Sequence, residues 1–305
     1  MNDRYWICVL AFALAGCGID TNRPLTDPGC DLEAAFGAPQ PFTELNTGLS
    51  EWSASLTDDE LEVVFLSDRV GTMWSPEIWT ATRKSRSAPW ENIHMISKLA
   101  SLAGQESGLA ISGDGLDLYF SLLVTPTRKL YRAHRASRAH AFSPPEEIAQ
   151  QNDLYEFEIA LAPSNNLYAS ARSPTADNRD VFLYPFDGKG WSSPVVLDGV
   201  ASITDETGMA ISKDERTLFF ARQVAKGVAE TSETWIAQRA STSEPFAALK
   251  RLDELTFVGG GTIPSWVSSD GCRLYVAMYS PDPRLPQMGR GWYDLAVASK
   301  PAKKR

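Results

Sequence analysis

An eleven-residue pattern recurs along the 305-residue chain, and this repeat constrains the fold more than any other feature of the sequence. Each copy contains a short apolar run, a polar turn that usually includes Asp, and a second run in which apolar and polar residues alternate. That order is typical of a β-hairpin, because Asp-Gly tolerates the positive φ angles of a tight turn. The copies are 110–120, 210–220, 266–276, 55–65 and a shorter one at 160–169.

The spacing of the copies predicts a unit of four strands. Corresponding anchor residues follow one another at intervals of 55, 50, 50 and 56 residues, which is the period of a propeller blade. The anchors are Thr57, Ser112, Ala162, Ser212 and Ser268. Third strands are predicted at 78–81, 130–133, 181–184, 234–237 and 295–298. A fourth strand begins at an aromatic residue that is often followed by proline, which suits an outermost strand because its missing N–H breaks no ladder bond.

The two ends of the chain complete each other. The fifth copy ends near Lys300 before any fourth strand, whereas Phe36–Pro39 has the fourth-strand pattern and precedes the first copy. We therefore expect an all-β fold, a β-propeller of five four-stranded blades that is closed by an N-terminal outer strand and spans 30–299. Residues 300–305 are basic, and we expect them to form a disordered tail.

The N-terminus is expected to direct the chain to the bacterial cell envelope. Residues 1–16 have an uncharged apolar core that is too short to span a bilayer, as in a signal peptide. The segment Leu14-Ala15-Gly16-Cys17 resembles the bacterial lipobox, which implies a lipidated Cys17 followed by a tether over 17–29. Gly18, rather than Asp, favours the outer membrane by the same resemblance. The alternative is an ordinary secretory signal that is cut nearby.

Two cysteines remain once Cys8 leaves with the signal and Cys17 is lipidated. Cys30 enters the predicted closing strand and Cys272 lies in the blade that this strand completes, so we expect a disulfide between them in an oxidising compartment. Two free thiols are the alternative.

The repeat itself resembles a known family. Ser112-Gly113-Asp114-Gly115 leading into Leu118-Tyr119-Phe120, with a third strand such as Trp79–Arg83, is similar to the WD-type β-propeller repeat of TolB-like envelope proteins. The resemblance covers roughly 36–299 and implies the fold rather than an activity. Propellers of this family usually have six blades, so a degenerate sixth blade is the alternative to five.

Four glutamates recur six residues before the anchors. They are Glu51, Glu106, Glu156 and Glu206, with Thr262 in the fifth copy. This position precedes the innermost strand, so the carboxylates are candidates for a shared site at one mouth of the channel, where a divalent cation would relieve their repulsion. The alternative is that each Glu accepts backbone hydrogen bonds within its own blade. We expect no other cofactor.

Two tryptophans fall in longer loops, Trp74 in 69–76 and Trp292 in 280–293. Long loops on a rigid ring are where propellers carry function, so these loops are candidate binding surfaces.

Composition and missing motifs narrow the function. With 29 Lys and Arg against 38 Asp and Glu, the net charge of −9 excludes a basic field for nucleic acid. The chain has three histidines and no nucleophile-elbow, phosphate-loop or zinc-protease motif. We expect a non-catalytic, lipid-anchored platform that binds an envelope protein or peptide. The alternative is a propeller that binds or cleaves cell-wall or extracellular polysaccharide, which exposed channel aromatics and carboxylates in unlike environments would favour.

Overall fold

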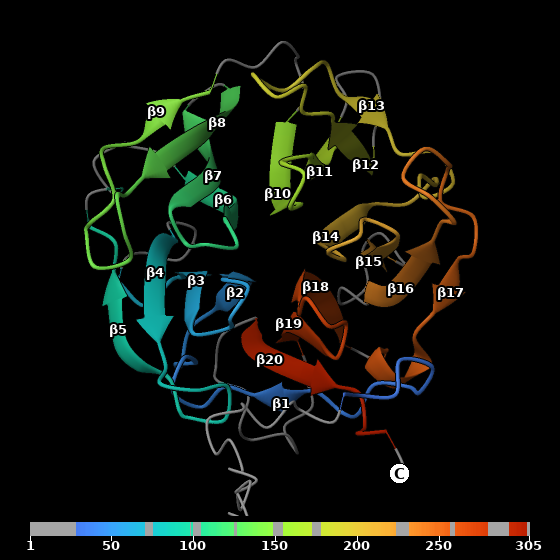
Figure 1. The fold of residues 1–305 in the computed structure, drawn as a ribbon, viewed down its shortest axis with the longest axis horizontal. Coiled ribbons are helices and arrows are strands. Elements are labelled where there is room, and N and C mark those ends of the chain that lie inside the picture. The colour runs from blue at the N-terminus through green and yellow to red at the C-terminus, as the bar shows by residue number, and fades with distance from the viewer. Residues whose placement is uncertain are drawn as a thin grey trace, which may run out of the picture.

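The computed structural model describes residues 29–70, 76–97, 99, 105–124, 127–148, 155–172, 178–223, 232–256, 260–279 and 293–303. These residues form five four-stranded antiparallel sheets that surround a common axis as the blades of a propeller (Figure 1). The predicted all-β fold and the number of blades are confirmed.

Four blades take their strands in chain order from the axis outward. Blade 1 contains β2 (Glu51–Leu56), β3 (Glu62–Ser67), β4 (Glu77–Thr82) and β5 (Glu91–Met95). Blade 2 contains β6 (Gln105–Ile111), β7 (Asp117–Val124), β8 (Thr127–His134) and β9 (Glu146–Glu147). Blade 3 contains β10 (Tyr155–Leu161), β11 (Leu167–Arg172), β12 (Arg179–Tyr184) and β13 (Val195–Val196). Blade 4 contains β14 (Glu206–Ile211), β15 (Thr217–Gln223), β16 (Ser232–Gln238) and β17 (Lys250–Arg251), followed by the short 3₁₀ helix η1 (Asp253–Leu255).

Blade 5 joins the two ends of the chain. It contains β18 (Gly261–Val267), β19 (Arg273–Tyr279) and β20 (Asp294–Ser299), and its outermost strand is β1 (Gln40–Pro41). The predicted closing strand began earlier, at Phe36. That segment also contacts blade 5, because the Gly37 N–H donates to the Ser299 carbonyl at 2.8 Å.

The disulfide between Cys30 and Cys272 is confirmed, with Cα atoms 5.6 Å apart. Beside it, the expectation of a disordered tail does not hold for residues 300–303. The Asp31 N–H donates to the Pro301 carbonyl at 2.9 Å, and Lys300 Nζ donates to the Ala34 carbonyl at 2.6 Å. The C-terminal segment is therefore held against the N-terminal one by backbone pairing that its composition does not show.

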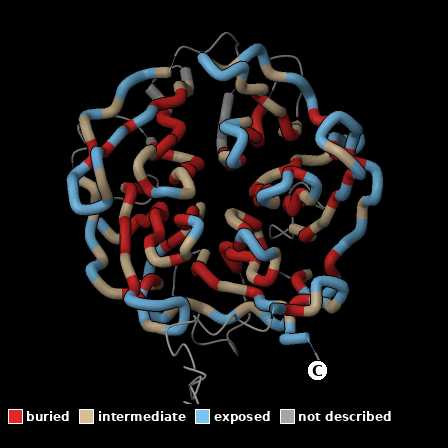
Figure 2. The backbone as a smooth tube through the Cα atoms, in the orientation of Figure 1, coloured by how far each residue is buried: buried red, intermediate tan, exposed pale blue. Residues whose placement is uncertain are grey.

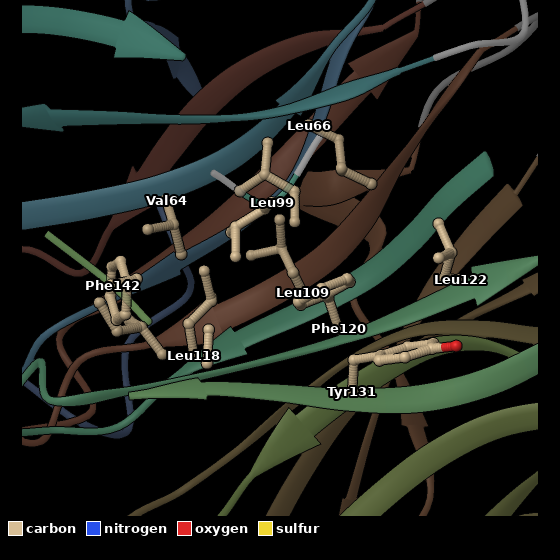
Figure 3. Packing of buried hydrophobic residues seen from close by; sticks show 12 residues of the cluster. Val64, Leu66, Leu99, Leu109, Leu118, Phe120, Leu122, Tyr131 and Phe142 are labelled. Carbon is tan, nitrogen blue, oxygen red and sulfur yellow. The ribbon is translucent and has the colours of Figure 1, made fainter. Parts of the chain in front are cut away.

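The hydrophobic core lies between neighbouring blades. Leu66 of β3 and Leu99 pack with Leu109, Phe120 and other apolar side chains of blade 2 (Figure 3). Exposed segments follow much of the outer rim, and buried ones lie within and between the sheets (Figure 2). The alternating apolar residues of each hairpin therefore fill the space between two sheets rather than one central core.

The ring has two faces. All the hairpins between first and second strands lie on one of them, which we call the turn face. There Asp58 of blade 1 accepts a hydrogen bond from Lys213 of blade 4 at 3.1 Å, and its backbone N–H donates to the Gly113 carbonyl of blade 2 at 2.9 Å. The opposite face, at which the innermost strands begin, we call the entry face.

Arginines join the blades on the turn face. Arg135 lies 4.5 Å from the Phe142 ring, donates to the Gly115 carbonyl at 2.7 Å, and forms an ion pair with Glu62 of blade 1 at 2.6 Å. Arg83 and Arg239 repeat the ring contact and the turn contact in blades 1 and 4. A planar guanidinium can stack on an aromatic ring, donate to a turn carbonyl and bind a side chain of the neighbouring blade at the same time, which explains why arginine recurs at this position.

Candidate ligand-binding cavity on the channel axis

A cavity of about 380 Å³ lies on the axis toward the entry face. The innermost strand of every blade contributes to its wall, through Trp52, Glu106, Glu158, Thr207 and Ile263. This volume lies within the range of small-molecule sites. The propeller therefore brings side chains from all five repeats to one cavity.

Glu106 is a buried acid in the wall. Its residue is 5% exposed, and burial raises the pKa of its carboxyl to about 8, with the nearby Glu77 adding to the rise. Among the described residues, the only hydrogen bond to this carboxyl comes from its own backbone N–H. At pH 7 most molecules therefore carry Glu106 as a neutral acid, which can donate a hydrogen bond.

Glu158 lies in the cavity wall beside glycines of the two adjacent blades. A Cβ on Gly108 of β6 would lie 2.2 Å from the Glu158 Cα, and a Cβ on Gly208 of β14 would lie 3.3 Å from Glu158 Oε2. Burial raises the pKa of Glu158, while the charge of Arg179 and a hydrogen bond from the Gly208 N–H oppose that rise. Unlike Glu106, this carboxyl has a nearby cation that favours its charged form.

A third acid and two arginines complete the charged part of the wall. Burial raises the pKa of Asp68, and the charge of Glu51 adds to the effect. Arg128 donates to Ser107 Oγ at 2.6 Å, and Arg179 Nε lies 3.5 Å from Asp205 Oδ2. The three acids thus have different surroundings although they share one cavity.

Aromatic and hydroxyl side chains form much of the rest of the wall. Trp52, Tyr279 and Tyr293 are half-buried, and the two tyrosine rings lie 6.0 Å apart. The hydroxyl side chains in the wall are Ser50, Ser53, Ser107, Thr207, Ser232 and Ser265. The cavity therefore presents both flat apolar surfaces and many groups that donate and accept hydrogen bonds.

The four recurrent glutamates do not share one environment in the structure. Glu51 is fully buried and accepts hydrogen bonds from Thr47 and from Ser67 Oγ, the latter at 2.7 Å. Glu206 is fully buried and accepts from Ser202 and from Arg222 Nε, the latter at 2.9 Å. Burial raises the pKa of Glu206 although these donors oppose it. Neither residue is in the cavity wall.

The cross-strand partner explains why Glu106 differs. Glu51 pairs with Ser67 and Glu206 pairs with Arg222, so each has a donor directly opposite. Glu106 pairs with Leu122, whose side chain has no hydrogen-bond donor. The sequence contains this difference, since the residue 16 positions after Glu51 is Ser, after Glu106 is Leu and after Glu206 is Arg.

Several predicted residues lie outside what the structure describes. These are Cys17, Trp74, Trp292 and the side chain of Glu156. The sequence did not identify Glu158, Asp68, Arg128 or Arg179. Glu158 was missed because the equivalent positions in β6 and β14 are Gly108 and Gly208, so no carboxyl recurs at this position of the repeat.

Within the described ranges, no group of three or more His, Cys, Asp and Glu side chains is arranged to hold a metal ion. The same ranges contain no helix long and apolar enough to cross a membrane.

Comparison with known proteins gives structural neighbours only. No protein-family model matches the sequence, and no curated protein matches it. The chain is similar to TolB from Acinetobacter baumannii, with a TM-score of 0.51 and 14% identity over 85% of this chain and 57% of that one. It is also similar to an α-L-arabinofuranosidase from Podospora anserina in complex with cellotriose, with a TM-score of 0.55 and 11% identity over 90% of this chain and 99% of that one.

At these identities the likeness establishes the fold alone. The chain spans little more than half the length of the Acinetobacter TolB. The protein is a five-bladed β-propeller with TolB-like structural neighbours.

Proposed function

We propose that this protein is a lipid-anchored β-propeller of the bacterial cell envelope that binds a glycan in its central cavity. The observation that carries the proposal is the composition of the cavity wall, in which hydroxyls, aromatic rings and acids from all five blades face one space. Glycan binding is the second of the two functions that the sequence predicts, and the composition of the cavity wall supports it more than the protein or peptide platform.

The wall suits a neutral, polyhydroxylated ligand. Sugar hydroxyls both donate and accept hydrogen bonds, and serine hydroxyls do the same. The apolar face of a sugar ring can pack on an aromatic side chain such as Trp52. A neutral Glu106 can donate to a sugar oxygen without bringing an unpaired charge into the cavity.

A binding measurement tests this proposal. The Trp52→Ala variant and the wild type would be titrated with soluble peptidoglycan fragments and exopolysaccharide oligosaccharides in a calorimeter. We expect measurable binding by the wild type and a loss of about 2- to 13-fold or more in the variant, since an aromatic contact contributes about 0.5–1.5 kcal/mol beyond area burial. Trp191→Ala, on the outer part of blade 3 and outside the cavity wall, is the matched control. No binding of any glycan by the wild type would overturn the proposal.

Anchoring is a separate part of the proposal. Lipidation of Cys17 would bury several acyl chains, each CH₂ contributing about 0.8 kcal/mol, which holds the protein stably at a membrane. Incorporation of a labelled fatty acid into the wild type but not into Cys17→Ser tests it, and sucrose-gradient fractionation distinguishes outer from inner membrane. Absence of label from the wild type would overturn the anchor.

A protein or peptide platform is the second candidate. Leu49, Val70 and Ile203 lie in loops on the entry face and are 42%, 52% and 95% exposed. Such residues suit a protein contact. In the sequence, Trp74 and Trp292 come two and one positions before Pro76 and Tyr293, which belong to the cavity wall. Cross-linking to solubilised envelope tests this candidate, and a reproducible partner that is lost in Ile203→Ser would favour it over the glycan.

A further inference from the structure

We propose that the cavity hydrolyses a glycosidic bond, with Glu106 as the proton donor to the leaving oxygen and Glu158 as the base that activates water. This inference rests on the proposed function, because it requires a glycan in the cavity.

The two acids are brought together by neighbouring innermost strands. Glu106 lies in β6 and Glu158 in β10, and both are in the cavity wall. The strands approach closely at Gly108, two residues after Glu106, where a Cβ would be 2.2 Å from the Glu158 Cα. A ligand in the cavity can therefore contact both carboxyl groups.

The surroundings of the two acids assign their roles. Glu106 is 5% exposed, pairs across the strand with Leu122, and has no described side chain that donates to it. The negative charge of Glu77 also favours the protonated form of Glu106. A proton donor in a glycosidase needs such an environment, which keeps the acid neutral near pH 7.

Burial raises the pKa of Glu158 as it does that of Glu106, but Glu158 has a cation beside it and Glu106 has an anion. The guanidinium of Arg179 and the N–H of Gly208 both act to stabilise its carboxylate. Because Arg179 favours the charged form of Glu158, we assign Glu158 as the base, and the stereochemistry of the product tests this role against that of a nucleophile. A cation beside one acid and an anion beside the other favour the base role for the first and the acid role for the second.

The reaction is a hydrolysis that needs water alone as co-reactant. A water oxygen forms a bond to the anomeric carbon as the bond from that carbon to the glycosidic oxygen breaks. Glu106 gives its proton to the departing oxygen, and Glu158 takes one from the attacking water. The two carboxyl groups return to their starting states after one proton passes from Glu158 to Glu106 through solvent.

The test uses the detergent-solubilised full-length protein with synthetic glycosides as probes. One set carries a 4-nitrophenyl leaving group and the other a 2,4-dinitrophenyl group, over several hexosides, N-acetylhexosaminides and pentosides. Release of nitrophenolate from at least one sugar is expected. Glu106→Gln should lower kcat/KM by about 100-fold or more for 4-nitrophenyl glycosides. It should have less than a tenfold effect on the 2,4-dinitrophenyl glycosides, because that leaving group departs without a proton.

Glu158→Gln should lose activity on both sets, and sodium azide should restore it by forming a glycosyl azide. The wild-type product should have inverted anomeric configuration by NMR, and retention would overturn the base role of Glu158. Glu147→Gln, at an exposed carboxyl of β9, is the control and should keep full activity. Thermal unfolding of each variant separates loss of chemistry from loss of fold.

The outcomes distinguish the two proposals. Glycan binding by calorimetry without release of nitrophenolate from any probe would overturn the hydrolysis and leave the binding function standing. An absence of both would overturn both. Equal loss on the two leaving-group sets in Glu106→Gln would overturn the proton-donor role.

Discussion

Gly108 of blade 2 lies so close to Glu158 of blade 3 that a Cβ at position 108 would be 2.2 Å from the Glu158 Cα. Neighbouring atoms other than hydrogen do not approach this closely without a covalent bond, so one of the two strands would have to move. This contact links the spacing of two blades to the position of a cavity carboxyl.

Gly108→Ala should therefore displace β10 from β6. We expect a lower Tm, with a loss of about 1–3 kcal/mol typical of overpacking, together with a loss of ligand binding. Differential scanning calorimetry and the glycan titration measure the two effects. Gly48→Ala is a matched control, because a Cβ there meets no atom within 4 Å. A variant that matches Gly48→Ala in both measurements would contradict the close approach.

Stability should depend on pH through Glu106. Its folded pKa of about 8 exceeds the ordinary value of 4.5, so the folded state holds this proton more tightly than the unfolded chain does. The corresponding stability is fully present below pH 4.5 and is lost as the pH rises to 8, by an amount on the order of 5 kcal/mol.

Urea unfolding of the wild type and Glu106→Gln at pH 4, 6, 7 and 9 tests this dependence. The wild type should lose stability relative to the variant between pH 4.5 and 8 and show no further change above that range. A difference between the two proteins that stays constant over all four pH values would show that Glu106 ionises as an ordinary carboxyl.

The buried ion pair between Arg135 and Glu62 should matter much more than exposed pairs. The two side chains are 7% and 6% exposed and join blades 1 and 2. Arg135→Met removes the cation and leaves a buried carboxylate, which costs about 3–5 kcal/mol. Lys84→Met breaks the ion pair with Glu91. The side chains of Lys84 and Glu91 are 81% and 42% exposed, so this change should cost at most about 1 kcal/mol. Equal values from chemical unfolding would contradict this ranking.

The disulfide should stabilise the closed ring. Cys30 and Cys272 are separated by 242 positions, and linking so long a loop lowers the entropy of the unfolded chain by an amount worth about 5 kcal/mol. Cys30→Ser with Cys272→Ser should lower Tm, and the reducing agent dithiothreitol should lower the Tm of the wild type but not that of the double variant. Insensitivity of the wild type, with two reactive thiols detected under native conditions, would show that the bond does not form in solution.

The sequence by itself determined the blades, their number and their closure. Strands and tight turns depend on neighbouring residues, so the alternation of apolar and polar residues and the Asp-Gly turns were enough to predict the hairpins. The absence of a fourth strand after β20 then identified 36–39 as the closing segment. The pairing of Cys30 with Cys272 followed from that closure. The tail from Lys300 was misjudged because its backbone partners, at 29–31, are at the other end of the chain.

The candidate site depended on tertiary structure. Four glutamates look equivalent in the sequence, yet Ser67 and Arg222 donate to two of them, whereas Leu122 offers Glu106 no side-chain donor. Glu158 of β10 lies in the wall of the same cavity, where the strand of the neighbouring blade approaches it closely at Gly108. The state of a carboxyl depends on which groups surround it, and those groups come from strands and blades that only the folded ring brings together.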